Sequence, residues 1–331
     1  MKTRRHGLKV MLAFLGVAAA LLMAAVPVHA QRFPTKPVRI FTPFPAGSGP
    51  DAALRLVAER LSKKWGQAVV IENKAGGNGF IAISAFKQGA TDGYDLIQLD
   101  NNSVTTHPHT FSKLPFDPER DFTPLRIIVR TFFFVAVAAD SPYKTIDDIV
   151  AAARAEPGKI NYGSWFMGSP GHMGALKLES MMGVKMTHIP FRDFGQLYAA
   201  VANKEVAWAM GSVASAGALE RAGKLRFIAM AAPARDVLYP NVPSTAEVAS
   251  TKGFEVSGWT GLYGPRGLPM VLRDQLAADI GEALAVPEVV ERYRILGYET
   301  PNYSPAEISA LIRRESTDWA VVIKAANLKL D

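Results

Sequence analysis

Residues 38–51, VRIFTPFPAGSGPD, decide the fold assignment, because an apolar run there leads through a glycine-rich turn into a helix. The run 38–44 is rich in β-branched and aromatic residues and predicts a strand. The helix is predicted from Pro50, since proline suits the first helical position, where its missing N–H costs nothing. Residues 160–172, INYGSWFMGSPGH, repeat this order with Ser169 as N-cap and Pro170 at the first helical position.

Each of these turns has the features of an anion site. A glycine-rich turn lets backbone N–H groups point outward, and the N-terminus of the following helix adds a partial positive charge. One such turn is common and usually only reverses the chain. Two turns in two lobes favour a ligand with two acidic ends that is held from both sides.

The N-terminus predicts an exported protein. Four cations precede an apolar run over residues 10–26, which is followed by Pro27 and a small-residue site that ends at Ala30. This order is typical of a secretory signal peptide, so we expect cleavage after Ala30 and a mature chain that works in the periplasm. An uncleaved anchor is the alternative, because the run falls just short of the roughly 18 to 20 apolar residues that span a bilayer.

Composition excludes several classes of function. The 331 residues carry a formal net charge of +7, and four of the cations lie in residues 1–30, which leaves about +3 on the mature chain. No dense basic run is present, which argues against a nucleic-acid partner. Cysteine is absent, which excludes disulfides, zinc-thiolate sites, iron-sulfur clusters and thiol nucleophiles. We expect a soluble monomer without metal or cofactor.

Apolar runs alternate with segments of helical period, which is typical of an α/β protein with largely parallel strands. The chain is expected to cross between lobes near Phe132 and near Ser257. Residues 31–131 plus 257–331 would form lobe 1, and residues 132–256 would form lobe 2, in a hinged clamshell. The predicted strands are 38–44, 69–72, 95–99, 160–164, 188–191, 206–210 and 225–231. The predicted helices are 50–65, 81–90, 146–155, 170–182, 197–202, 270–285 and 305–325.

A dinucleotide site is the main rival for the first turn. Gly47, Gly49 and Ala52 match G-x-G-x-x-A after a strand, and Glu72 stands where a ribose-binding acid would be expected. Prolines before and inside the motif break the strand-to-turn geometry, and an exported chain would meet little nicotinamide cofactor. We therefore predict no cofactor.

Catalytic and metal motifs are missing from the sequence: there is no G-x-S-x-G elbow, phosphate-binding P-loop or H-E-x-x-H helix. His107 and His109 could ligate a metal, but they lie in the Pro-, Asn- and Thr-rich stretch 101–124. We expect that stretch to be a long surface excursion and both rings to be exposed to solvent. His172 is the histidine expected at a ligand, with a capping role as the alternative.

Several segments carry a resemblance to a known family. They are residues 33–40, Pro43-Phe44-Pro45-Ala46-Gly47, Pro50-Asp51, 67–73, 114–124, 157–164, 188–192, 222–226 and 240–247. In these segments the chain resembles the receptors of tripartite tricarboxylate transporters, also called Bug receptors. The resemblance implies a periplasmic-binding-protein-like (type II) clamshell of two α/β lobes. It also implies capture of a small carboxylate for the membrane permease subunits of the transporter.

Carried over by position, the resemblance implies a ligand site with one part in each lobe. The first part is Phe44, Pro45, Ala46, Gly47, Ser48 and Asp51. The second part is Ser164, Trp165, Phe166, Gly168, Ser169, His172 and Arg192. Backbone N–H and hydroxyl groups would bind the carboxylates, partly through ordered water.

The expected walls of the site depart from the family's pattern. Aromatic Trp165 and Phe166 stand where many members carry small residues, and Phe191-Arg192-Asp193 replaces tyrosine-lysine-glycine. We hypothesise that these aromatic residues, with Phe132 and Phe133, line the cleft and stack on a flat aromatic carboxylate such as a phthalate-type diacid. The alternative is that the phenylalanines belong to the core and that Trp165 is a lid.

Two other classes of function stay open. A liganded receptor could dock on a signalling partner such as a histidine kinase, because sensing and transport use the same closed state. An exported enzyme is the third class, although the sequence shows no nucleophile-base constellation or metal cluster.

Overall fold

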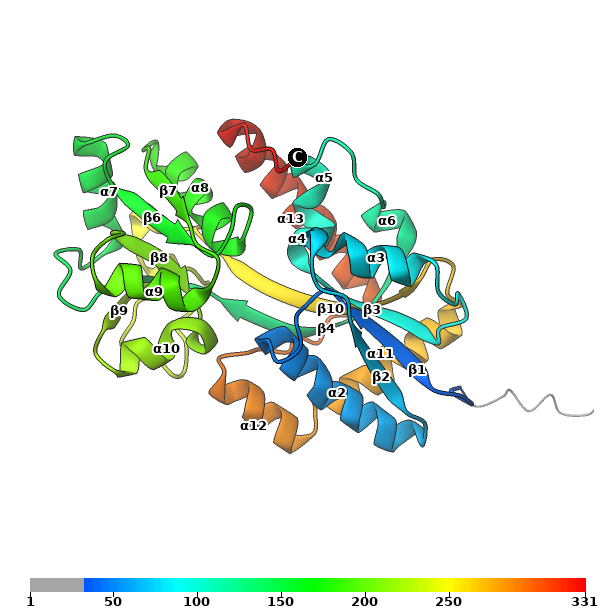
Figure 1. Cartoon of the computed structure of the whole chain (residues 1–331). Helices are drawn as coiled ribbons and strands as arrows, with labels where there is room; N and C mark the ends of the chain where they lie inside the picture. Colours follow the sequence, from blue (N-terminus) through cyan, green and yellow to red (C-terminus); the bar gives the residue numbers. More distant parts are fainter. Residues whose placement is uncertain (1–32) are drawn as a thin grey trace, which may run out of the picture. The chain divides into compact units, whose positions relative to one another are not determined.

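The computed structural model describes residues 33–331, and the signal peptide predicted over residues 1–30 lies outside them. Residues Lys36–Asp331 form one compact unit. Its framework is two five-stranded sheets, each accompanied by helices (Figure 1). This arrangement confirms the predicted fold class of two α/β lobes.

The first sheet has the strand order β2-β1-β3-β10-β4. Its strands are β1 (Val38–Thr42), β2 (Val69–Asn73), β3 (Asp95–Asp100), β4 (Phe122–Phe132) and β10 (Ser257–Pro265). β1 pairs in parallel with β2 on one side and β3 on the other, which buries all its residues except Arg39. Ligands of open α/β sheets bind beyond the carboxyl ends of such strands, where the first turn begins.

The second sheet has the order β7-β6-β8-β5-β9. Its strands are β5 (Phe134–Ala138), β6 (Asn161–Ser164), β7 (Thr187–Pro190), β8 (Trp208–Gly211) and β9 (Leu225–Met230). β6 is parallel to β7 and β8, but β5 is antiparallel to β8 and β9, as β10 is to β3 and β4. The sheets are therefore mixed. The periodicity could not show this, because it carries no strand direction.

Helix ends follow signals in the sequence. α2 ends at Gly66, whose φ of 65° lies in the left-handed region that favours glycine. Capping boxes open α7 (Thr145 with Asp148) and α13 (Ser304 with Glu307). The helices are α2 (Gly49–Trp65), α3 (Phe80–Lys87), α4 (Asn101–Thr105), α5 (His107–Thr110), α6 (Pro118–Asp121), α7 (Ile146–Ala155), α8 (Pro170–Met182), α9 (Phe194–Ala202), α10 (Val213–Arg221), α11 (Met270–Leu284), α12 (Pro287–Ile295) and α13 (Pro305–Ala326). Three-residue 3₁₀ turns lie at Gly77–Gly79, Thr245–Glu247 and Ala249–Thr251.

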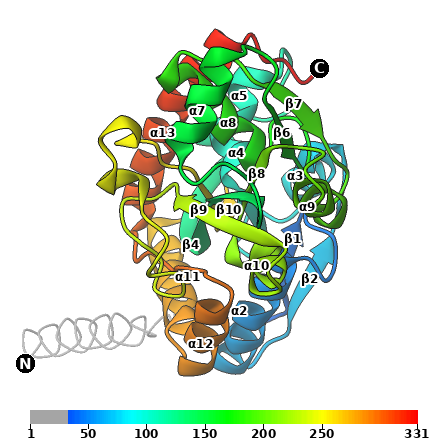
Figure 2. The same cartoon turned by 90° about the vertical axis from the view of Figure 1, so that its left-hand side faces the viewer.

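Each lobe has its own apolar core. In the first lobe, Trp259 on β10 packs in one cluster with residues of α3 and α13. The second sheet has clusters that include Trp208 in one case and Phe134 in the other. The C-terminal helices pack back on the first lobe, where α11 and α12 contact α2 (Figure 2). The tail therefore completes the lobe that the N-terminal strands began.

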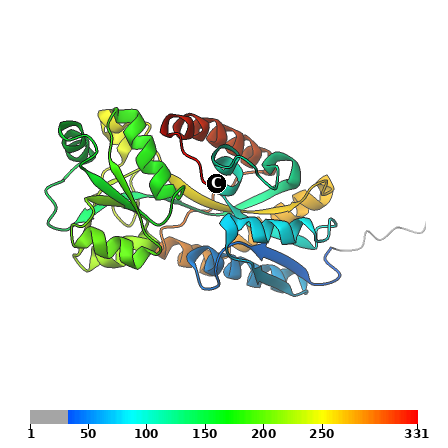
Figure 3. The same ribbon diagram turned by 45° about the horizontal axis from the view of Figure 1, so that its top comes forward.

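Two adjacent segments join the lobes. β4 and β10 run side by side from the first lobe towards the second (Figures 1 and 3). β4 ends at Phe132, opposite Ser257 of β10, and β5 of the second sheet begins only two residues later. The N–H of Phe133 donates to the carbonyl of Val256 at 3.1 Å, so the crossing segments are hydrogen-bonded to each other.

The stretch 101–124 differs from the expected surface excursion. It contains α4, α5 and α6, and residues 101–106 are at most 5% exposed. The hydroxyls of Thr105 and Thr106 donate to the carbonyls of Asn101 and Asn102, so these polar residues can be buried without unpaired groups. Helices α10 and α12 are additional to those predicted, because short helices leave a weak periodic signal.

Candidate ligand-binding site

A cavity of about 580 Å³ lies between the lobes, where the turns that follow β1 and β6 meet. Its aromatic wall is formed by Phe44, Trp259 and Tyr298 of the first lobe and by Phe133, Trp165, Phe166 and Phe194 of the second. The first turn adds Pro45, Ser48, Gly49 and Pro50, and the segment after β7 adds Arg192 and Asp193. The volume and the apolar lining with a few polar groups suit a small organic ligand.

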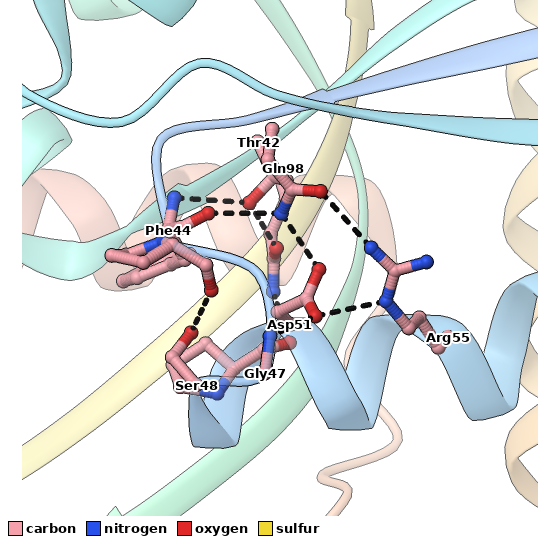
Figure 4. A network of polar contacts seen from close by, with 10 residues as sticks. Thr42, Phe44, Gly47, Ser48, Asp51, Arg55 and Gln98 are labelled. Carbon is pink, nitrogen blue, oxygen red and sulfur yellow. Dashed lines mark hydrogen bonds and ion pairs between the residues drawn. The ribbon is translucent and has the colours of Figure 1, made fainter.

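Asp51 holds the first turn in shape (Figure 4). Its fully buried carboxylate accepts hydrogen bonds from the N–H of Gly47 (2.8 Å), Nε of Arg55 (2.8 Å) and Nδ2 of Asn73 (2.7 Å). Burial alone would raise the pKa of Asp51, but the hydrogen bonds from Arg55, Asn73 and Gly47 outweigh burial, and the pKa lies below its ordinary value. Asp51 therefore stays ionised and supports the turn from behind.

The first turn leaves the start of α2 without a side-chain cap. Ser48 is the N-cap residue, but its hydroxyl donates to the carbonyl of Pro45 at 2.7 Å and accepts nothing from the helix. Among the described residues, the N–H groups of Gly49 and Asp51 have no hydrogen-bond acceptor. Ser48 and Gly49 line the cavity. An anion there would meet the unpaired N–H of Gly49 and the positive end of α2.

The second turn is closed by its own side chains. The hydroxyl of Ser169, which is fully buried, accepts a hydrogen bond from the N–H of His172 at 3.3 Å and caps α8. The N–H of Gly168 donates to Nδ1 of His172 at 2.9 Å, which places the ring proton of His172 on Nε2. Ser164 is also fully buried, and its hydroxyl donates to the carbonyl of Phe166 at 2.9 Å.

Two neutral histidines stack beside the second turn. The ring centroids of His172 and His188 lie 4.0 Å apart, and the ring planes differ by 17°. Burial, helped by His188, lowers the pKa of His172 to about 3, and burial lowers the pKa of His188 to about 4. Nε2 of His188 contacts the hydroxyl of Ser164 at 2.7 Å. His172 therefore supplies a neutral ring that holds the turn, as in the capping alternative.

Six of the thirteen predicted site residues line the cavity: Phe44, Pro45, Ser48, Trp165, Phe166 and Arg192. Ala46 and Gly47 are exposed in the first turn beside them. Structural partners occupy the side chains of Asp51, Ser164, Ser169 and His172 and the N–H of Gly168, so ligand contact stays a prediction for these residues. Phe133 lines the cavity as hypothesised, but Phe132 packs in the core beside Phe134, and its placement in the cleft wall was wrong.

Three further residues of the aromatic wall were missed by the sequence analysis. Phe194 begins α9, Trp259 lies on β10 and Tyr298 follows α12. No motif marks them, and Trp259 and Tyr298 lie more than 200 positions from the first turn. Nε1 of Trp259 donates to Glu315 of α13 at 3.0 Å, and burial raises the pKa of Glu315 to about 7.

The two histidines of α5 are placed differently from the prediction. The His107 ring is buried against Phe80 and Phe111, and Nε2 of His109 contacts the hydroxyl of Ser316 at 2.8 Å. Within residues 33–331, no group of three or more His, Cys, Asp or Glu side chains is arranged to hold a metal ion. Over the same residues, no helix combines the length and the apolar character needed to cross a membrane.

The two lobes and the cavity between them define a solute-binding receptor. Comparison with known proteins then gives the family. The profile of the tripartite tricarboxylate transporter family receptor matches residues 53–328, and this chain belongs to that family. The resemblance found in the sequence is thereby confirmed, and the family is one of solute-binding receptors.

Relatives match nearly the whole chain. A protein from the tcbD-tcbE intergenic region of Pseudomonas sp. (strain P51) is 30% identical over 307 residues, which are 92% of this chain and 91% of that protein. An R. palustris protein solved with adipate is 28% identical, with a TM-score of 0.78 and coverage of 90% and 99%. MatC of Rhodopseudomonas palustris, solved with malate, is also 28% identical, with a TM-score of 0.75 and coverage of 88% and 100%.

Proposed function

We propose that this chain is exported, is cleaved after Ala30 and captures a small dicarboxylate in the periplasm for the permease subunits of a tripartite tricarboxylate transporter. The observation that carries the proposal is the uncapped start of α2 in the cavity wall. Unpaired N–H groups at a helix N-terminus bind carboxylates without any neighbouring cation. The similarity to proteins solved with adipate and with malate supports the same ligand class.

The proposed mechanism is closure of two bodies, residues 31–131 plus 257–331 and residues 132–256. An open form would admit the ligand, and the crossing segments at Phe133 and Val256 would act as the hinge. Closure is favoured only by contacts that exist in the shut state. Nδ2 of Asn102 donates across the lobes to the carbonyl of Gly168 at 3.3 Å, and it is a candidate for such a contact.

The more specific proposal is that the ligand has a flat aromatic ring between its two acidic groups. Trp165 lies between Phe133 and Phe194, with ring centroids 5.6 Å and 5.1 Å apart. These rings form a continuous aromatic wall, and Phe166 next to them is half exposed. A phthalate-type ring could stack on this wall, whereas an aliphatic chain would gain only apolar contact.

Calorimetric titration of the mature protein with phthalate, terephthalate, adipate and citrate tests both levels of the proposal. We expect an aromatic diacid to bind most tightly. Tighter binding of adipate or citrate would refute the proposal of an aromatic ligand but not that of a carboxylate receptor. No binding of any of these acids would refute the proposal of a carboxylate receptor. We propose binding without chemistry, so each acid should be recovered unchanged after incubation.

Delivery to the permease requires a separate experiment in cells. Deletion of the gene should abolish uptake of the acid that binds in vitro. Normal uptake with lost ligand-induced expression would instead support the signalling alternative.

A further inference from the structure

Within residues 33–331, side-chain donors without a partner lie in the cavity wall of both lobes, and Tyr298 and Arg192 are two of them. Among the described residues, neither the guanidinium of Arg192 nor the hydroxyl of Tyr298 has a hydrogen bond or an ion pair. Arg192 is also the one cation among the residues that line the cavity. The acids in the wall act as helix caps: Asp100 accepts from the N–H of Ser103, and Asp193 caps α9.

Tyr298 is held in place by the first sheet. The next residue, Glu299, exchanges two backbone hydrogen bonds with Arg130 of β4, at 2.7 Å and 2.8 Å. The hydroxyl of Thr131 donates to the carbonyl of Gly297 at 3.2 Å. The Tyr298 ring is fixed edge-on against Tyr293, with centroids 5.8 Å apart. Backbone and ring contacts therefore set the position of its hydroxyl, which needs no hydrogen bond of its own.

The hydroxyl of Tyr298 lies against the first turn of α2. A Cβ at position 49 would stand 2.6 Å from this oxygen, so only glycine leaves room for it there. The unpaired N–H of Gly49 belongs to the same turn. Burial raises the pKa of Tyr298, so the phenol remains a hydrogen-bond donor at neutral pH. A carboxylate at the start of α2 would therefore have this hydroxyl within reach.

Arg192 supplies a different kind of donor from the other lobe. It lies two residues after the end of β7 and is exposed, next to Asp193 and Phe194 in the wall of the cavity. A guanidinium is permanently charged, and its forked N–H groups match the two oxygens of a carboxylate. No described side chain competes for these groups.

We propose that Tyr298 and Arg192 recognise the two ends of the ligand. Tyr298 donates to the carboxylate held at the start of α2, and Arg192 selects for a second acidic group at the other end. This assignment rests on the proposed function and deepens it, because it makes the receptor selective for diacids over monoacids. Tyr298 would strengthen the binding of every carboxylate, and Arg192 would make the receptor prefer diacids to monoacids.

Titration of the full mature chain with matched acids separates the two roles. The pairs are terephthalate with benzoate and adipate with hexanoate, so the test does not depend on an aromatic body. Tyr298→Phe, which removes one oxygen atom, should weaken both members of a pair by about five- to tenfold. Arg192→Gln should weaken the diacid by about tenfold and the monoacid by less than about twofold.

Matched controls come from the same chain. Tyr143→Phe removes the hydroxyl of a half-buried tyrosine outside the cavity wall, and Arg266→Gln removes an exposed cation outside it. Neither control should change affinity, and melting curves should show that all four variants fold. Equal weakening of diacid and monoacid by Arg192→Gln, or full affinity of Tyr298→Phe, would overturn this inference while the receptor stands. Failure of the unmodified protein to bind any acid would overturn both.

Discussion

The first and second turns share one backbone design but differ in what they leave free. The serine N-caps have nearly the same conformation, with φ and ψ of −68° and 161° at Ser48 and of −62° and 157° at Ser169. In each turn, the side chain three residues after the serine accepts the N–H of the glycine before it, from Gly47 to Asp51 and from Gly168 to His172.

The difference lies in the serine hydroxyl. The hydroxyl of Ser169 accepts a hydrogen bond from the N–H of His172 and caps α8. The hydroxyl of Ser48 instead donates to the carbonyl of Pro45, so the N-terminus of α2 has no side-chain cap. A glycine-serine pair with a proline one or two residues later thus predicts the path of the backbone correctly in both lobes. It does not predict whether the N–H groups are available to a ligand, because the choice between two hydrogen bonds of similar strength depends on the surroundings.

The largest effect is expected from the side chains that hold the two turns. Asp51→Ala would remove the charged acceptor that Gly47, Arg55 and Asn73 share, so the free energy of unfolding should fall by about 3 kcal/mol. Diacid affinity should fall more than about tenfold, as measured by calorimetry. His172→Ala, the equivalent change in the second turn, should also destabilise the protein but change affinity less than about threefold. Equal losses of affinity would contradict the contrast between the turns.

The second turn should also be more sensitive to acid. The pKa values of His172 (about 3) and His188 (about 4) lie below the unfolded value of about 6.5. Each ring therefore contributes stability that is present above pH 6.5 and is lost as the pH falls towards 4, by up to about 1.4 kcal/mol per unit. Asp51, whose pKa is lowered, should lose its contribution only at lower pH.

Urea unfolding between pH 4.5 and 7.5 would measure this sensitivity. The stability difference between the unmodified protein and His188→Gln should shrink by about 2 kcal/mol as the pH falls through this window. Glu315→Gln should change the slope with the opposite sign, because the raised pKa of Glu315 gives stability that is lost as the pH rises through about 7. If the difference in the free energy of unfolding between the unmodified protein and His188→Gln did not change with pH, protonation of the stacked rings would not contribute to the acid sensitivity.

Gly47→Ala and Gly168→Ala should differ in the stability that they cost, because a neighbouring side chain packs against only one of the two glycines. Gly47 and Gly168 have φ values of 81° and 79°, so either substitution should cost about 1 kcal/mol through backbone strain. A Cβ at Gly168 would also stand 2.8 Å from Leu330, whereas one at Gly47 would touch nothing within 4 Å. Thermal melts should show a total loss of about 2 kcal/mol for Gly168→Ala. Leu330→Ala in the same chain should restore part of it.

The smallest expected effect is the difference in stability between Ser169→Ala and Ser48→Ala. Ser169→Ala removes a real cap and should lower the free energy of unfolding by about 1 kcal/mol. Ser48→Ala should cost less than about 0.5 kcal/mol, because its hydroxyl caps nothing in α2. A loss at Ser48 as large as that at Ser169 would mean that Ser48 stabilises the first turn in another way.

Sequence patterns located most of the fold and four of the seven aromatic residues in the cavity wall. The helix predicted over residues 170–182 has the same bounds as α8, because Ser169, Pro170 and Gly183 are local signals that act within a turn of the helix. The stretch 101–124 was misjudged, because its polar side chains are paired by contacts that composition cannot show. The wall residues Trp259 and Tyr298 were missed, because nothing beside them in the chain marks a ligand.

The sequence by itself determined the family, the α/β class and the two strand-turn-helix units, because these depend on residue type and on spacing along the chain. Only the tertiary structure decided which turn is open, which aromatic rings face the cavity and which donors stay unpaired. Those properties depend on hydrogen-bond partners that come from distant strands and helices, and a pattern of neighbouring residues does not encode them.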